Sequence, residues 1–337
     1  MPARIALIGE CMIELQQHAD GTLVQGFGGD TLNTAVYLRR LLPSDWQVSY
    51  VTALGDDSFS DAMCKAWEAE GIDLSLVQRL PGRLPGMYCI QTDAQGERSF
   101  LYWRNEAAVR DCFNQQGAIE VLGRLQDYSV IYLSGITLAV LGDEGMDNLL
   151  PQLIEARKHG ALLVFDNNYR PRLWRDRQHA QDTYARLLPF VDIALITLED
   201  EHALFQEADA ESTFQRYAQA GTLHVVLKRG ANSCLIENSF KCYEVAAEVV
   251  DNVVDTTAAG DSFSAGYLAA SLQGLSPDHA AVKAHSLAAR VIQCPGALIP
   301  LAAMPGAFRA GNEDDDLSVD TDSSELGCSE QDCAGDY

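Results

Sequence analysis

The chain has 337 residues, of which 47% are hydrophobic, and a formal net charge of -24 at pH 7. That length accommodates one large α/β domain with a modest additional element. The sequence contains no run of eighteen or more apolar residues and no basic, apolar leader segment, so we expect a soluble, cytoplasmic protein. The acidic balance argues against nucleic acid as a partner, because phosphate backbones are bound by basic stripes.

Apolar runs alternate with amphipathic stretches along the chain. The apolar runs predict strands over residues 5–9, 47–54, 130–134, 162–167, 193–197, 224–228 and 234–236. The amphipathic stretches predict helices over 31–42, 58–70, 145–159, 180–190, 199–204, 212–221, 261–273 and 277–294. This alternation is typical of a mostly parallel sheet with helices on both faces, whose ligand crevice lies at the carboxyl ends of the strands.

Two pairs of short segments interrupt this alternation. Residues 11–17 with 22–27, and 86–92 with 98–103, predict hairpins, the second closed by a loop over residues 94–96. If Gly96 is left-handed in a three-residue loop, Tyr88 lies opposite Tyr102, and Arg104 projects from the same face. Such a face suits a polyhydroxylated, negatively charged ligand. The alternative is an aromatic pair that only stabilises an exposed hairpin.

The segment before the first predicted helix reads Gly-Gly-Asp-Thr-Leu-Asn-Thr-Ala over residues 28–35. Gly28 and Gly29 permit a tight turn and the close approach of a ligand. Asp30 and Asn33 are three residues apart and face the same side of the helix that begins there. Taken alone, this segment fits a sugar-binding site and an ordinary capped helix start equally well.

A second polar segment precedes the helix predicted over residues 261–273. Ala258, Ala259 and Gly260 place backbone N–H groups at the start of that helix, where its positive end attracts an anion. Asp261 follows, and its carboxylate is placed to accept the proton of a hydroxyl group that attacks a phosphoryl group. The alternative is an Asp that merely caps an ordinary helix.

The two segments, in this order, resemble the signatures of the phosphofructokinase-B (ribokinase-like) family of carbohydrate kinases, and the resemblance extends from residue 5 to about residue 300. It implies an α/β, ribokinase-like three-layer fold with a small β lid that covers the sugar and, in relatives, often supplies a homodimer contact. It also implies ATP and Mg²⁺ as cofactors. Asp261 would be the general base, the amides of residues 258–261 the anion hole, and Gly29, Asp30 and Asn33 ligands of substrate hydroxyls.

Residues 166–174 resemble the Asp-x-Asn-x-Arg segment of the 2-dehydro-3-deoxygluconate kinase subgroup of this family. Arg170 is the informative position, because a guanidinium matches a carboxylate with paired hydrogen bonds that a neutral sugar does not require. Tyr88, Tyr102, Arg104 and Arg170 would then bind the ring side and carboxylate of a sugar acid. A surface ion pair is the alternative for Arg170.

The resemblance therefore implies ATP-dependent phosphorylation of 2-dehydro-3-deoxygluconate to its 6-phosphate, a step of the Entner–Doudoroff or uronate pathways. Two alternatives stay open. One is another sugar kinase of the same fold, acting on ribose, fructose or a sugar phosphate, since a phosphorylated sugar would also satisfy two arginines. The other is a non-catalytic sugar-binding regulator, although a pure binding protein has no use for the base Asp261.

Further residues are assigned to the nucleotide and the metal by the same resemblance. Lys228, Gly230 and Ser233 lie in a segment similar to the family's Lys-x-Gly-x-x-Gly turn, with Ser233 in place of the last glycine. His285 occupies the place where many relatives carry Asn beside the adenine, and Asn168 and Gly260 complete the nucleotide set. Glu201 matches the Glu of the family's Asn-x-x-Glu motif and would hold Mg²⁺ through water, although Leu198 replaces the Asn. An acidic helix face is the alternative.

The carboxy-terminal segment differs in composition from the rest of the chain. Residues 311–337 contain ten acidic side chains and no Lys or Arg. Such a segment buries too little apolar surface to offset its ordering entropy, so we expect a disordered tail over residues 309–337. The kinase domain is predicted over residues 1–308, with lid strands at approximately 10–27 and 85–106.

Overall fold

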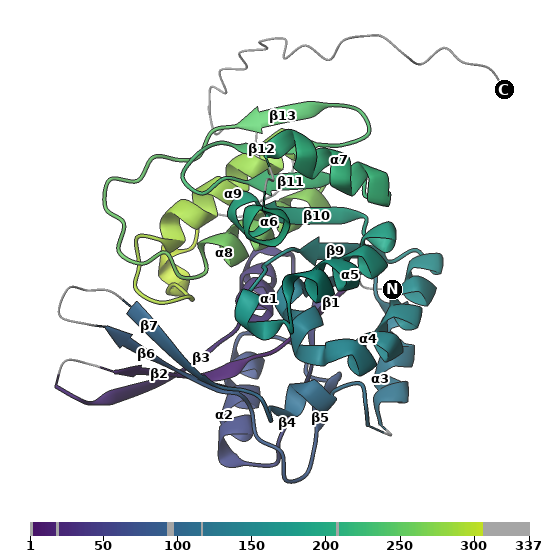
Figure 1. Cartoon of the computed structure of the whole chain (residues 1–337). Coiled ribbons are helices and arrows are strands. Elements are labelled where there is room, and N and C mark those ends of the chain that lie inside the picture. The colour runs from purple at the N-terminus through teal and green to yellow at the C-terminus, as the bar shows by residue number, and fades with distance from the viewer. Residues whose placement is uncertain (1–2, 18–19, 93–97, 116, 207–208, 306–337) are drawn as a thin grey trace.

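A nine-stranded sheet forms the centre of the computed structural model, which describes residues 3–17, 20–92, 98–115, 117–206 and 209–305 (Figure 1). The strands, in spatial order, are β13 (Cys242–Val245), β12 (Cys234–Glu237), β11 (Val225–Lys228), β10 (Ile193–Thr197), β9 (Leu162–Asp166), β8 (Val130–Ser134), β1 (Arg4–Ile8), β4 (Gln47–Leu54) and β5 (Val77–Arg79). The pairs from β11 to β5 are parallel, whereas β12 and β13 are antiparallel additions. The predicted α/β class with a mostly parallel sheet is confirmed.

Helices cover both faces of this sheet. They are α1 (Asp30–Leu41), α2 (Ser58–Ala69), α3 (Ala118–Gly123), α4 (Gly135–Lys158), α5 (Arg177–Leu187), α6 (Leu198–Phe205), α7 (Ala210–Ala220), α8 (Ala259–Leu272) and α9 (Pro277–Val291). Side chains of the buried strands alternate between two cores. On β1, Ile5 and Leu7 pack in the core with α1, α2, α8 and α9, whereas Ala6 and Ile8 pack in the core with α4 and α5. This burial of both strand faces explains the continuous apolar runs in the sequence.

The beginning of α4 differs most from the sequence-based prediction, which began this helix at residue 145. The helix begins at Gly135, because Ser134 forms a capping box in which its side chain accepts from the Thr137 N–H. Gly142 interrupts the helix with φ 66°, in the left-handed region that favours glycine. The apolar periodicity was therefore recognisable only after this kink. Strands β5 and β13 and helix α3 were not predicted.

A second sheet of four strands forms the lid and projects from the main body (Figure 1). Its order is β3 (Leu23–Gly28), β2 (Met12–Gln17), β6 (Met87–Thr92) and β7 (Arg98–Trp103). Both predicted hairpins are present, and Tyr88 lies opposite Tyr102 as predicted. The predicted loop over residues 94–96 and the predicted tail over 309–337 lie outside the described residues.

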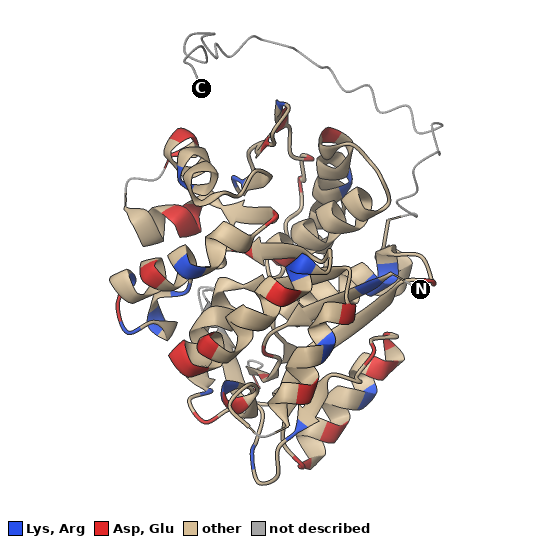
Figure 2. Ribbon diagram, turned by 90° about the vertical axis from the view of Figure 1, so that its right-hand side faces the viewer, with Lys and Arg blue, Asp and Glu red and all other residues tan. Residues whose placement is uncertain are grey.

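Acidic and basic residues are interspersed on the elements visible in Figure 2. Arg157 of α4 pairs with Asp192 at 2.7 Å, and Arg186 of α5 pairs with Asp147 of α4 at 2.6 Å. Exposed pairs of this kind stabilise a fold by about 1 kcal/mol or less. Among the described helices, none combines the length and apolar character that crossing a membrane requires.

Candidate active site

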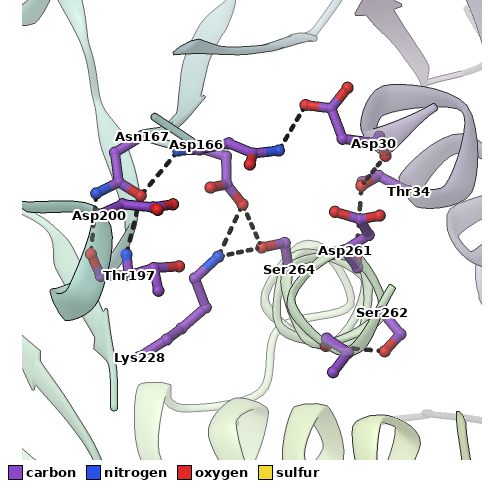
Figure 3. A network of polar contacts seen from close by, with 12 residues as sticks. Asp30, Thr34, Asp166, Asn167, Thr197, Asp200, Lys228, Asp261, Ser262 and Ser264 are labelled. Atoms are coloured by element: carbon purple, nitrogen blue, oxygen red, sulfur yellow. Dashed lines mark hydrogen bonds and ion pairs between the residues drawn. The ribbon is translucent and has the colours of Figure 1, made fainter. Parts of the chain in front are cut away.

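Polar side chains gather where the parallel strands end. Glu10 lies just after β1, Asn168 just after β9, and Lys228 at the end of β11. Because carboxyl ends of parallel strands meet at one edge of a sheet, residues far apart in the sequence become neighbours there. Figure 3 shows the result, with Asp30 of α1 and Asp261 of α8 facing the strand-end residues.

A cleft of about 790 Å³ lies between this edge of the sheet and the lid. Five residues predicted to bind substrate line it, namely Gly29, Asp30, Tyr102, Arg104 and Arg170. The sequence-based interpretation did not include the other lining residues, among them Glu10, Phe100, Asn105, Ile136 and Arg172. A concave space with a few convergent polar groups is the usual form of a small-molecule site.

The start of α1 forms the floor of the cleft. A Cβ atom on Gly29 would collide with the backbone carbonyl of Glu10, so only glycine allows this close approach of the chain. Asp30 accepts a hydrogen bond from Asn168 Nδ2 at 2.7 Å, and burial raises the pKa of its carboxyl group. One turn later, Asn33 Nδ2 donates to Asp261 Oδ2 at 2.9 Å. Residues from the two predicted signatures therefore meet directly.

The start of α8 presents open N–H groups at Gly260 and Asp261, whereas the predicted donor Ala259 already donates its N–H to the carbonyl of Thr256 at 3.2 Å. Ala258 has φ 59°, a left-handed conformation that turns the chain into Ala259 and the helix. Among the described residues, no acceptor binds the backbone N–H groups of Gly260 and Asp261. The first N–H groups of a helix have no partner within it, so this end of α8 can bind an anion.

Asp261 lies in the first turn of α8 and is partly shielded from solvent. Burial raises the pKa of its carboxyl group to about 7, with a further contribution from the negative charge of Asp30; the hydrogen bond from Asn33 opposes this rise. A carboxyl group with a pKa near neutrality can accept a proton and release it again at physiological pH. The predicted general base thus has a suitable acidity.

Lys228 forms an ion pair with the buried carboxylate of Asp166, close to the start of α8. Its ammonium group donates to Asp166 Oδ2 at 2.8 Å and to Ser264 Oγ at 3.1 Å (Figure 3). A Cβ atom on Gly260 would lie 3.9 Å from the Lys228 Nζ atom. The positive charge therefore lies beside the open N–H groups of α8, where it adds to their attraction for an anion.

The lid residues predicted to bind the sugar have partners of their own. Arg104 forms a buried ion pair with Glu10, and its guanidinium lies 5.9 Å from the centroid of the Tyr102 ring. The Tyr88 hydroxyl donates to Glu14, and its ring lies 5.8 Å from that of Tyr102. The aromatic pair and Arg104 thus lie together, as the strand register predicts.

Arg170 pairs with Asp200, with Nη1 3.1 Å from Oδ1. The Arg170 side chain is still 51% exposed, so the guanidinium is available to the cleft that it lines. Asp200 was not among the predicted site residues. Its carboxyl pKa is raised by burial and lowered in part by Arg170. A ligand carboxylate would therefore compete with Asp200 for this arginine.

Comparison with known proteins agrees with this geometry. The model of the pfkB family of carbohydrate kinases matches residues 2–304. The chain belongs to this family. It is 48% identical over 309 residues to the 2-dehydro-3-deoxygluconokinase of Escherichia coli K12, covering 90% of this chain and 100% of that protein. It is 49% identical over 305 residues to the enzyme of the same name from Dickeya dadantii, covering 89% and 98%.

Solved structures confirm the predicted fold. A putative ribokinase II from Escherichia coli, in complex with ATP and Mg²⁺, superposes with a TM-score of 0.75 at 20% sequence identity, covering 90% of this chain and 96% of that chain. The protein described here is a carbohydrate kinase with the ribokinase-like architecture that the sequence resemblance implied.

The other residues predicted to contact the nucleotide lie on several different elements of the kinase. Gly230 has φ 61°, and the Ser233 hydroxyl contacts Arg229 and Glu244. His285 is buried against the Phe263 ring, with centroids 4.9 Å apart. Asn168 lies on the sugar side, against Asp30. The roles of these residues toward a nucleotide stay predictions.

Glu201 is fully buried in the kinase, and both of its carboxylate oxygens accept hydrogen bonds. Its role toward Mg²⁺ stays a prediction.

Glu10, Asn167 and Asp200 were not among the predicted site residues, although all three follow or lie near predicted strand ends. A search for every polar residue within a few positions of those ends would have found them.

Proposed function

We propose that the kinase transfers the γ-phosphoryl group of ATP to the C6 hydroxyl of 2-dehydro-3-deoxygluconate. The placement and acidity of Asp261 carry this proposal. Its carboxylate lies at the start of α8, next to two N–H groups that have no acceptor among the described residues, and it is linked through Asn33 to the floor of the sugar cleft. As the hydroxyl oxygen forms its bond to the γ-phosphorus, the bond from that phosphorus to the bridging oxygen breaks, ADP leaves, and the hydroxyl proton passes to Asp261.

The chain's own groups fit a nucleotide phosphate. The N–H groups of Gly260 and Asp261 would hold anionic oxygens, and Lys228 would add positive charge; Gly230, Ser233 and His285 would contact the nucleotide. The described residues contain no cluster of three or more metal-ligating side chains. This suits Mg²⁺, which usually keeps several waters and enters with the phosphates. When bound, Mg·ATP supplies the phosphoryl group and neutralises charge on it.

The arginines of the cleft support an acidic sugar as substrate. Gly29, Asp30 and Asn33 would contact hydroxyl groups, while Tyr88 and Tyr102 cover the ring. Arg104 and Arg170 would bind the carboxylate, since a guanidinium forms paired, charge-assisted hydrogen bonds with such a group. Glu10 and Asp200 pair with these arginines and so offset their positive charges within the cleft.

The lid would close over the bound sugar and exclude water, which disfavours the transfer of the phosphoryl group to water.

The lid face opposite Tyr88 and Tyr102 carries exposed apolar side chains. Leu23, Leu101 and Trp103 share this face by the strand register. These side chains support a homodimer contact through the lid. Light scattering after size-exclusion chromatography would give a dimer mass, and Trp103→Ser would reduce it to a monomer mass.

A coupled assay of ATP consumption across a sugar panel tests the proposed activity. The panel contains 2-dehydro-3-deoxygluconate, ribose, fructose and a ketohexose phosphate, with Asp261→Asn as the background control. We expect the highest kcat/KM with 2-dehydro-3-deoxygluconate. Higher kcat/KM with a neutral sugar would refute the assignment of the sugar acid, and sugar binding without turnover would indicate a regulator.

A further inference from the structure

Asn167 is a fully buried amide that joins two strand ends beside the active site. Its Nδ2 donates to the carbonyl of Thr197 at 3.0 Å and to Glu201 Oε1 at 3.2 Å. Its Oδ1 accepts from the N–H groups of Thr197 and Asn168, both at 2.9 Å (Figure 3). Every donor and acceptor of this side chain is therefore occupied, which restricts it to one orientation.

Glu201 is the second buried group that holds the Asn167 side chain in place. Its Oε1 also accepts from the Tyr217 hydroxyl at 2.9 Å, and its Oε2 accepts from Arg216 Nη1 at 2.9 Å. The Arg216 guanidinium lies in turn 3.8 Å from the centroid of the Phe205 ring. Glu201 has no exposed surface, so its two oxygens are committed to groups of α7 and to Asn167.

The hydrogen bond that the Asn168 N–H donates to Asn167 connects this buried amide with the cleft. Asn168 has φ 25°, which residues other than glycine rarely adopt, and the hydrogen bond from its own N–H to Asn167 supports this conformation. In this conformation the Asn168 amide donates to Asp30 Oδ2 at 2.7 Å. A continuous series of hydrogen bonds thus runs from Glu201 through Asn167 and Asn168 to Asp30.

We propose that Asn167 is a positioning residue for the sugar site, and that Glu201 serves as its anchor. Asn167 holds the backbone of Asn168 in place, and Asn168 orients the Asp30 carboxylate toward the hydroxyl groups of the substrate. Asn167 itself contacts neither sugar nor nucleotide. This inference rests on the proposed function, in which Asp30 binds the sugar.

Steady-state kinetics of Asn167→Ser, with sugar, ATP and Mg²⁺ varied in turn, test the proposal. Serine cannot reproduce the four bonds of the amide, so Asp30 loses its fixed orientation. We expect the KM for 2-dehydro-3-deoxygluconate to rise about 10-fold, the usual effect of losing a hydrogen bond to a charged group. The KM for ATP stays unchanged. An unchanged sugar KM in the folded variant would overturn the proposal.

Asn168→Gly provides a second test that does not depend on the folding of Asn167→Ser. Glycine adopts φ 25° without strain but lacks the amide that contacts Asp30. We expect a melting temperature close to that of the wild type and the same rise in sugar KM. A normal sugar KM would show that Asp30 does not depend on this amide, and the proposal would fail.

Thr222→Ala is the matched control for a lost buried hydrogen bond. Thr222 is fully buried, and its Oγ1 donates to the carbonyl of Leu188 at 3.0 Å, away from the cleft. We expect a lower melting temperature with an unchanged sugar KM. An equal rise in sugar KM in this control would attribute the effect to general destabilisation and overturn the proposal.

Glu201→Gln separates an anchor from a metal site. As an anchor, Glu201 affects the sugar KM, and the Mg²⁺ concentration for half-maximal activity stays unchanged. A higher Mg²⁺ requirement with a normal sugar KM would refute the anchor role. If the wild-type kinase acts only on another sugar, the proposed function is wrong, and the same comparison of KM values on that sugar still tests the positioning role.

Discussion

At the scale of single residues, the chemistry depends on Asp261 and its immediate contacts. Its carboxyl group is shielded from solvent and lies near the negative charge of Asp30, and both effects raise its pKa. The bond from Asn33 holds the carboxylate in a fixed direction. The same environment that makes ionisation costly makes this carboxylate a better proton acceptor.

Asp261→Asn tests this role directly. The amide oxygen still accepts the bond from Asn33, so the fold and sugar binding are preserved, while the proton acceptor is lost. We expect kcat to fall roughly 10²–10⁴-fold, the usual contribution of a positioned base. Kinetic assays measure kcat, and circular dichroism shows whether the fold is preserved. The exposed Asp251→Asn serves as a control, and near-normal turnover of Asp261→Asn would remove Asp261 from the mechanism.

Arg170→Lys tests whether the cleft recognises a carboxylate. Lysine keeps the charge but loses the paired hydrogen bonds of the guanidinium, which costs on the order of 1.5–3 kcal/mol. We expect kcat/KM for 2-dehydro-3-deoxygluconate to fall roughly 10–100-fold, with little change for a neutral analogue that lacks the carboxylate. The exposed Arg175→Lys is the control. Equal losses on both substrates would assign Arg170 to the nucleotide or the fold.

At the scale of secondary structure, the site depends on the contact between α1 and α8. These helices bring Asn33 and Asp261, 228 positions apart in the chain, within hydrogen-bonding distance. The close approach of the α1 start to the strand end after β1 requires Gly29, because a Cβ atom would meet the Glu10 carbonyl. The geometry of the floor of the cleft therefore depends on one small residue.

Gly29→Ala is expected to displace the first turn of α1 and with it Asp30 and Asn33. Overpacking of this kind costs typically 1–3 kcal/mol, so we expect a lower melting temperature together with a higher sugar KM. Differential scanning fluorimetry and kinetics measure the two effects. Gly123→Ala is the matched control, since a Cβ atom there meets open space. A variant with unchanged stability and KM would contradict this account of Gly29.

At the scale of the whole molecule, both activity and stability are linked to pH through Asp261. The base must be ionised to act, so we expect kcat/KM to rise with pH and to level off above about 7. The contribution of Asp261 to the free energy of unfolding changes in the opposite direction and falls as the pH rises. The native pKa lies above the ordinary value of 3.8, so the unfolded chain ionises first, and this group's contribution to stability is lost as the pH rises toward 7.

Melting temperatures of the wild type and Asp261→Asn between pH 4 and pH 8 test this linkage. The variant has no ionisable group at this position, so its melting temperature relative to the wild type should increase with pH across this range. A constant difference between the two proteins would show that the native pKa of Asp261 is not raised. The kinetic profile and the melting profile give independent measures of the same pKa.

The sequence alone determined the order of most strands and helices, with β5, β13 and α3 missed, as well as the strand register of the lid hairpin and the two signatures that contain Asp30 and Asp261. These features depend on local periodicity and on residue types at short spacing, which a linear sequence displays directly. The start of α4 escaped prediction because Gly142 breaks the apolar period of that helix.

Only the tertiary structure decided which charged groups share the cleft and which are already paired. The pairs of Glu10 with Arg104 and of Asp200 with Arg170 join residues 94 and 30 positions apart, and Asn167 contacts Glu201 across 34 positions. The parallel sheet creates these contacts by bringing its strand ends to one edge, and periodicity contains no record of such long-range proximity. The acidity of Asp261 likewise depends on burial, which exists only after the chain has folded.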